Sequence, residues 1–95
     1  MTAGADRAPK PLHRPTPRYP SWARRQGIEG YVLVRMTVGE DGRVNTAEVV
    51  KSQPKGTFDQ VALAAARRYR FSPARKGGRV SSGSVTQRIV FRLKR

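Results

Sequence analysis

Apolar and polar residues alternate with a period of two over residues 31–38, which predicts a β-strand with one buried face. The side chains predicted to face inward are all apolar: Val32, Val34, Met36 and Val38. A Gly-Glu-Asp-Gly turn at 39–42 leads to a less regular strand at 43–52. Its apolar phase slips between Thr46 and Ala47, which indicates either a β-bulge or a twisted strand end. The two strands form a predicted hairpin.

The same alternation returns in the last segment of the chain, residues 85–95. One face is mainly apolar and consists of Val85, Gln87, Ile89, Phe91 and Leu93. The opposite face is mainly polar or charged and consists of Thr86, Arg88, Val90, Arg92 and Lys94. Charge on one face of a strand is typical of a strand at an exposed sheet edge.

Residues 56–73 follow a helical repeat instead. The apolar stripe of this helix consists of Phe58, Val61, Ala62, Ala65, Ala66 and Tyr69. Thr57 and Gln60 form a capping-box pair at its predicted start, and Ser72 and Pro73 end it.

A shorter helix is predicted over residues 20–27. Pro20 suits the first helical position, and Gly27 suits the residue just beyond the last turn. We expect Trp22 to anchor this helix in the core.

The remaining segments lack a periodic pattern. Residues 1–17 are basic and rich in proline, and we expect them to form a disordered linker before one folded domain at 18–95. Residues 74–84 are predicted to be a polar, glycine-rich loop. Two helices and three strands predict an α+β fold, with both helices packed on one face of a three-stranded antiparallel sheet.

The charge of the chain is strongly positive. Twenty Lys and Arg residues stand against six Asp and Glu residues, which gives a net charge of +14. Such a chain attracts polyanions, including nucleic acid, anionic lipid and cell-wall polymers. The positive residues are spread along the whole sequence, which disfavours a dedicated basic arm. The absence of cysteine excludes disulfides and thiol chemistry.

No set of residues in the sequence has the spacing of a catalytic or metal-binding site. The six carboxylates are scattered, and the one histidine, His13, lies in the predicted linker without a group to orient it. We therefore expect no enzymatic activity, no cofactor and no metal.

Three motifs follow one another along the chain. They are PRYPSWARRQGIEGYVLVRMTVGEDGRV, FDQVALAAARRYRFSPA and VTQRIVFRL, which stand at residues 17–44, 58–74 and 85–93 and so extend over the region 16–93. Their order and spacing resemble the TonB C-terminal domain family, the periplasmic part of energy transducers in Gram-negative bacteria. Two positions depart from the family pattern: Thr16 stands where glutamine is frequent, and Tyr69 where tryptophan is common.

The resemblance implies a non-enzymatic coupling domain in the periplasm. It implies that residues 85–93 bind the TonB-box peptide of an outer-membrane receptor as an added strand, for active uptake of an iron-siderophore, haem or a vitamin. A second contact is implied for the segment Thr16, Pro17, Arg18, Tyr19 and Pro20. We expect the chain to be an excised domain of a protein anchored in the inner membrane.

The resemblance implies further partners as well. One is the motor complex ExbB–ExbD, reached through an N-terminal part outside this chain. Peptidoglycan is a secondary contact that the basic charge of a periplasmic domain would favour. A homodimer through the last strand is also an expected arrangement, because an open sheet edge can pair with its own copy.

Two other functions remain open at this point. One is a TolA-like periplasmic adaptor. The other is a small basic nucleic-acid-binding domain that stacks bases on Tyr31, Tyr69 and Phe71. The sequence contains no recognised nucleic-acid motif, and these aromatic residues occupy predicted core positions, so we expect no specific nucleic-acid partner.

Overall fold

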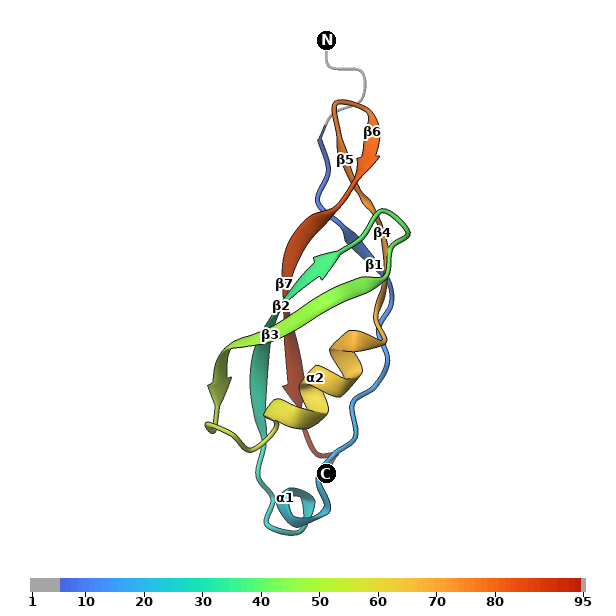
Figure 1. The fold of residues 1–95 in the computed structure, drawn as a ribbon. Helices are drawn as coiled ribbons and strands as arrows, with labels where there is room; N and C mark the ends of the chain where they lie inside the picture. The colour runs from blue at the N-terminus through green and yellow to red at the C-terminus, as the bar shows by residue number, and fades with distance from the viewer. Residues whose placement is uncertain (1–5, 95) are drawn as a thin grey trace.

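Three antiparallel strands form the central sheet of the computed structural model, which describes residues 6–94 (Figure 1). They are β2 (Gly30–Val38), β3 (Val44–Gln53) and β7 (Gly83–Phe91), in the spatial order β3-β2-β7. The central strand β2 pairs with β3 on one side and with β7 on the other. The turn at 39–42 connects β2 to β3, whereas β7 comes much later in the chain. The alternating pattern of residues 31–38 is confirmed, because its four inward side chains are fully buried: Val32, Val34, Met36 and Val38.

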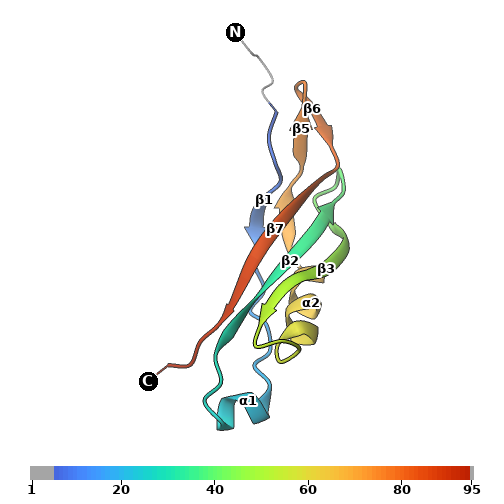
Figure 2. The same cartoon turned by 90° about the vertical axis from the view of Figure 1, so that its left-hand side faces the viewer.

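One face of this sheet is covered by α2 (Asp59–Arg67) (Figures 1 and 2). Ala62 and Ala66 of α2 are fully buried, and their small side chains let the helix lie close to the strands. The predicted α+β class is thereby confirmed. None of the helices within residues 6–94 is long and apolar enough to cross a membrane.

The short helix α1 (Ser21–Arg25) lies at one end of the sheet (Figure 2). It is shorter than predicted, and Pro20 precedes it with an extended ψ of 132°. Ala23 is its buried residue, whereas Trp22 is 44% exposed, so the prediction that Trp22 anchors the core is wrong. A helix of five residues directs few side chains inward, and here the small Ala23 occupies that position.

The long helix also differs from its prediction. It begins at Asp59 after Phe58, which makes no side-chain capping hydrogen bond, so the predicted Thr57–Gln60 capping box is wrong. It ends at Arg67, and the chain continues into the strand β4 (Arg70–Ser72). Phe71 is buried at 3% exposure in this strand. Burial of Phe71 in an extended segment therefore outweighs the helical tendency of the residues before it.

Strand β3 contains two irregularities rather than one. Its pairing with β2 skips Asn45 and, further on, Val50. Each skipped residue is the signature of a β-bulge. The predicted phase slip therefore is a bulge, displaced by one residue from its expected place, and the second bulge was not predicted.

Two segments expected to lack regular structure form strands. Within the predicted linker, β1 (Lys10–His13) pairs with β4. Within the predicted loop, β5 (Ala74–Lys76) and β6 (Arg79–Ser81) form a hairpin. Both predictions are wrong for these residues, because the backbone groups of β4 and β5 find partners that side-chain patterns do not reveal. Residues 1–5 of the predicted linker lie outside the described part of the chain.

Candidate functional site

The predicted binding strand is an edge strand with a regular backbone. Strand β7 pairs with β2 through nine consecutive residues, from Gly83 opposite Val38 to Phe91 opposite Gly30, without interruption. Among residues 6–94, no strand pairs with the other side of β7, which forms one edge of the sheet in Figure 2. Every second residue of an antiparallel strand directs its N–H and C=O to one side, so this edge offers about four or five such residues.

The opposite edge of the sheet is different. It is formed by β3, in which Asn45 and Val50 interrupt the pairing. Bulges twist an edge and break the regular row of donors and acceptors, which hinders the addition of another strand. Of the two edges of the central sheet, β7 is the better template for an extended peptide.

Side chains of β7 alternate as predicted. Ile89 and Phe91 are buried in the core cluster that also contains Ala62 and Ala66 of α2, while Val85 and Gln87 are half-buried. The other face is exposed, and Val90 leaves 47% of its surface accessible. Arg92 and Leu93, which were included in the predicted binding strand, follow the end of β7.

Tyr19 joins the second predicted contact segment to the end of β7. Its ring meets Phe91 edge-on at a centroid distance of 5.8 Å and meets Phe58 in the same way at 5.5 Å. Its hydroxyl donates a hydrogen bond to the carbonyl oxygen of Ile28. The structure thus brings Tyr19 next to the last residue of β7, although they are far apart in sequence.

The rest of that segment lies elsewhere. Pro17 and Arg18 line a hollow together with residues of α2, among them Gln60 and Ala64, and with Arg68 just after that helix. Thr16 is exposed. Pro20 is half-buried at the entry to α1. Only Tyr19 of the five predicted residues is shown in contact with a residue of β7.

The end of β7 is held in place by a contact that the sequence did not indicate. The backbone N–H of Leu93 donates to the carboxylate Oε2 of Glu29 at 2.7 Å. Glu29 also lines a hollow on the sheet surface with Tyr31, Val90 and Arg92. No sequence motif marks Glu29 for this role, because the contact depends on the pairing of β2 with β7.

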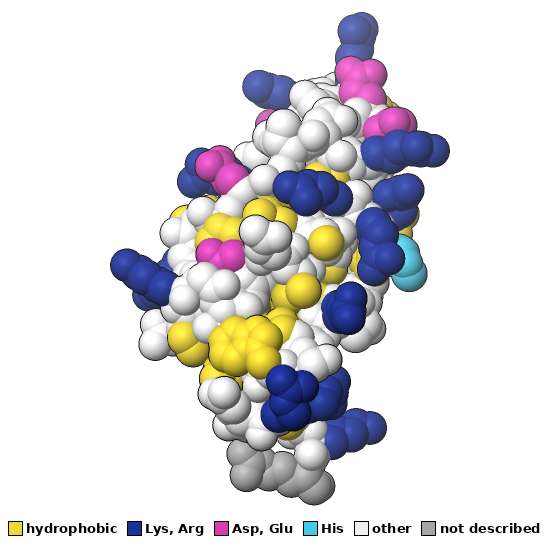
Figure 3. All heavy atoms as spheres, turned by 60° about the horizontal axis from the view of Figure 1, so that its bottom comes forward, with side chains coloured by type: hydrophobic (Ala, Val, Ile, Leu, Met, Phe, Trp, Pro, Cys, Tyr) yellow, Lys and Arg dark blue, Asp and Glu magenta, His cyan; other side chains and the backbone are white. Residues whose placement is uncertain are grey.

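Positive charge surrounds this region. The guanidinium carbon of Arg88 lies 4.3 Å from the centre of the Tyr31 ring, and that of Arg24 lies 4.9 Å from the Tyr19 ring. Both are cation–π contacts. Lys and Arg side chains project from much of the surface seen in Figure 3, with apolar side chains in a broken band between them. An acidic partner would be attracted to this surface.

Two tyrosines have shifted pKa values. Burial raises the pKa of Tyr19, and the nearby Glu29 adds to that effect while Arg24 opposes it. Burial also raises the pKa of Tyr69, with Arg14 opposing. Both hydroxyls therefore stay protonated at neutral pH. Residues 6–94 contain no cluster of three or more His, Asp or Glu side chains that could hold a metal ion.

The family model of the Gram-negative bacterial TonB protein C-terminal matches residues 15–93, which run from just before Tyr19 to just beyond β7. The chain belongs to this family.

Relatives and a solved structure agree with the assignment. Protein tonB2 of Pseudomonas aeruginosa is 40% identical over 82 residues, which cover 86% of this chain and 30% of that protein. Protein TonB of Escherichia coli K12 is 35% identical over 85 residues, which cover 90% of this chain and 34% of that protein. The chain thus spans about a third of the length of these TonB relatives.

The fold is similar to the solution NMR structure of the Pseudomonas aeruginosa TonB CTD. The TM-score is 0.75 at 34% sequence identity, and the match covers 95% of this chain and 91% of that one. The family model begins at residue 15, so β1 lies before the matched TonB region.

Proposed function

We propose that this chain is the periplasmic coupling domain of a TonB-type energy transducer, and that it binds the TonB-box peptide of an outer-membrane receptor along the free edge of β7. The observation that carries the proposal is the contrast between the two sheet edges: β7 is regular over nine pairs, whereas β3 is broken by two bulges. An added strand needs an unbroken row of backbone donors and acceptors.

The proposed mode of binding suits a mechanical role. Several backbone hydrogen bonds along one strand share a pulling force when the load acts parallel to the strand. The buried Phe91 at the end of β7 is packed between Phe58 and Tyr19, so the edge strand is anchored in the core. A load on the bound peptide would pass to the domain through this packing.

Family membership supports a proposal for the partners and the location. In the proposal, the receptor lies in the outer membrane, the motor complex ExbB–ExbD drives the transducer from the inner membrane, and this chain works between them without enzymatic activity. The transported compound is an iron-siderophore, haem or a vitamin. Thr16, Pro17, Arg18 and Pro20 are proposed as secondary contacts, since they adjoin Tyr19.

The experiment is a titration of the isotope-labelled domain with a synthetic peptide from a receptor N-terminus, followed by amide chemical shifts. We expect the largest shifts on β7 and around Tyr19, with small shifts on β3. A peptide of the same composition in scrambled order is the control. Shifts concentrated on β3, or equal shifts with both peptides, would contradict the proposal.

A second version of the experiment tests backbone pairing without altering the protein. Single N-methyl groups are placed at successive positions of the peptide, and each removes one N–H donor. Strand addition predicts that alternate positions weaken binding strongly, because only every second N–H faces β7. If binding depended on side-chain charge alone, the alternation would be absent and salt would decide the affinity instead.

A further inference from the structure

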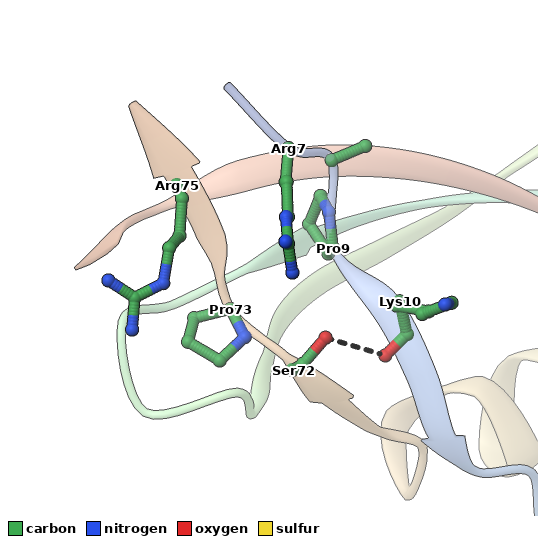
Figure 4. Close-up of a pocket in the computed structure, with 7 residues that line it drawn as sticks. Arg7, Pro9, Lys10, Ser72, Pro73 and Arg75 are labelled. Atoms are coloured by element: carbon green, nitrogen blue, oxygen red, sulfur yellow. Dashed lines mark hydrogen bonds between the residues drawn. The ribbon is translucent and has the colours of Figure 1, made fainter. Parts of the chain in front are cut away.

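A cationic surface lies at the end of the molecule opposite α1. A hollow between the N-terminal segment and the strands β4 and β5 is lined by residues that include Arg7, Lys10 and Arg75 (Figure 4). No carboxylate is among its lining residues. The buried Pro9 and the half-buried Pro73 form stiff parts of its wall.

Arg7 and Arg75 pair with each other through their backbones at this surface. The backbone N–H of Arg7 donates to the carbonyl of Arg75 at 2.8 Å, and the N–H of Arg75 donates to the carbonyl of Arg7 at 3.0 Å. Residues opposed in this way place their side chains on the same face, and like charges in such a pair destabilise it. In Figure 4 the Arg7 side chain extends into the hollow, and that of Arg75 leans away from it.

Within residues 6–94, neither Arg7 nor Arg75 forms an ion pair with a carboxylate, although Asp6 lines a neighbouring hollow together with both. The ion pairs found within residues 6–94 are Arg35 with Glu48 and Arg43 with Asp41. The nearest acidic residue in sequence, Asp6, accepts a hydrogen bond from the N–H of Gly77 at 2.9 Å. Arg75 donates to the carbonyl of Gly78 at 3.1 Å, which leaves its charge uncompensated.

Another group of paired basic residues, by contrast, has a carboxylate nearby. Arg70 lies opposite both Arg43 and His13 in neighbouring segments. There, the carboxylate of Asp41 approaches Arg43 to 3.8 Å and offsets part of the positive charge. No ion pair of this kind is formed by Arg7 or Arg75 within residues 6–94, so both guanidinium groups can bind an external anion.

An apolar side chain lies next to the two arginines. Val80 of β6 lies directly opposite Arg75, on the side away from Arg7, and 38% of its surface is exposed. Lys76 and Arg79 pair at the end of the same hairpin. An exposed apolar side chain flanked by arginines fits a lipid surface, where phosphate groups lie next to the acyl chains. A free phosphate ion would make no use of Val80.

From these contacts we propose that the surface formed by Arg7, Arg75 and Val80 docks on an anionic phospholipid membrane. The two guanidinium groups bind headgroup phosphates, and Val80 rests at the boundary of the acyl chains. This surface adjoins the start of β7 at Gly83 and Ser84 but uses none of the backbone groups of β7, so it does not depend on the proposed peptide binding. It gives the domain a second attachment, to a membrane surface.

The test measures partition of the domain onto vesicles of phosphatidylcholine mixed with phosphatidylglycerol, with pure phosphatidylcholine vesicles as reference. We expect binding to the anionic vesicles, reduced by salt. Arg7→Gln and Arg75→Gln should each weaken it roughly fivefold. Val80→Ser should weaken vesicle binding too. The matched control is Arg25→Gln in α1, which removes the same charge at the opposite end and should leave binding near that of the unmodified chain.

Three results would overturn the proposal. They are equal losses for Arg7→Gln and Arg25→Gln, absence of vesicle binding, and a response to inorganic phosphate at Arg7 and Arg75 without any affinity for vesicles. Amide spectra of each variant establish that it is folded. If a variant is unfolded, the proposal is tested on the amide signals of the unmodified chain instead. As anionic vesicles are added, the signals of residues 7, 75 and 80 should broaden before those of α1.

Discussion

Phe58 and Phe91 stack face to face, with ring centroids 4.2 Å apart and ring planes 11° apart. Phe58 is the residue before α2, and Phe91 is the last residue of β7. Both are buried, and Tyr19 meets each of them edge-on. This contact connects the start of the helix with the end of the candidate binding strand, so the stability of the domain and the position of its edge depend on the same rings.

Replacing Phe58 by alanine should therefore be costly. We expect Phe58→Ala to lower the free energy of unfolding by about 3–5 kcal/mol, because it leaves a cavity next to Phe91. Urea denaturation followed by circular dichroism measures this. Trp22→Ala is the control: Trp22 is 44% exposed whereas Phe58 is fully buried, so this change should cost clearly less than Phe58→Ala. Similar losses in both variants would contradict the assignment of Trp22 to the surface.

Gly42 and Gly56 allow a matched test of the turn after β2. Both have a positive φ, +83° and +78°. An added Cβ at Gly56 meets nothing within 4 Å, whereas at Gly42 it would lie 2.1 Å from the carbonyl oxygen of Phe71. We expect Gly56→Ala to cost about 1–3 kcal/mol from backbone strain alone, and Gly42→Ala to cost clearly more. Equal midpoints in urea would show that the Phe71 segment does not press on the turn.

Stability should decrease at alkaline pH. The pKa values of Tyr19 and Tyr69 are raised above the ordinary 10.0 by burial. The folded state therefore holds these protons more tightly than the unfolded chain, so their contribution is constant below about pH 10 and is lost as the pH rises through the folded-state values. Urea midpoints between pH 8 and 11 measure the effect. Tyr69→Phe should flatten the alkaline decrease, and an unchanged slope would contradict this account.

Val90 and Val50 offer a matched comparison of the two sheet edges. They are similarly exposed, at 47% and 50%, on β7 and β3 respectively. Proline removes a backbone donor and resists incorporation in a ladder. We expect Val90→Pro to reduce binding of a receptor peptide at least tenfold and Val50→Pro to leave it nearly unchanged. Isothermal titration of both variants gives the affinities, after amide spectra establish folding. A larger loss in Val50→Pro would move the binding site to β3.

Local patterns were sufficient for much of the central sheet. The alternation around Val34 predicted β2, and the alternation around Ile89 predicted β7. Successive side chains of a strand point to opposite faces of the sheet, so a strand with one buried face alternates between apolar and polar residues. The family resemblance, carried by residues 16–93, is confirmed by the family match. The binding role of the last strand stays a prediction.

Local patterns failed where distant backbone segments meet. Strand β1 contains Pro11 and lies in a proline-rich segment, and its side-chain pattern does not predict the pairing with β4. The helical repeat around Tyr69 continued past the point at which Phe71 enters a strand. Trp22 was expected inside because it is large and aromatic, but the geometry of a five-residue helix placed Ala23 there.

The sequence by itself determined the fold class, the central hairpin and the alternating faces, since these depend on periodicity along a single segment. Only the tertiary structure decided which sheet edge is regular, that Tyr19 lies against Phe91, and that Arg7 faces Arg75. These features arise from pairing between residues far apart along the chain. Such pairing is governed by backbone hydrogen bonds and packing, which no single segment encodes.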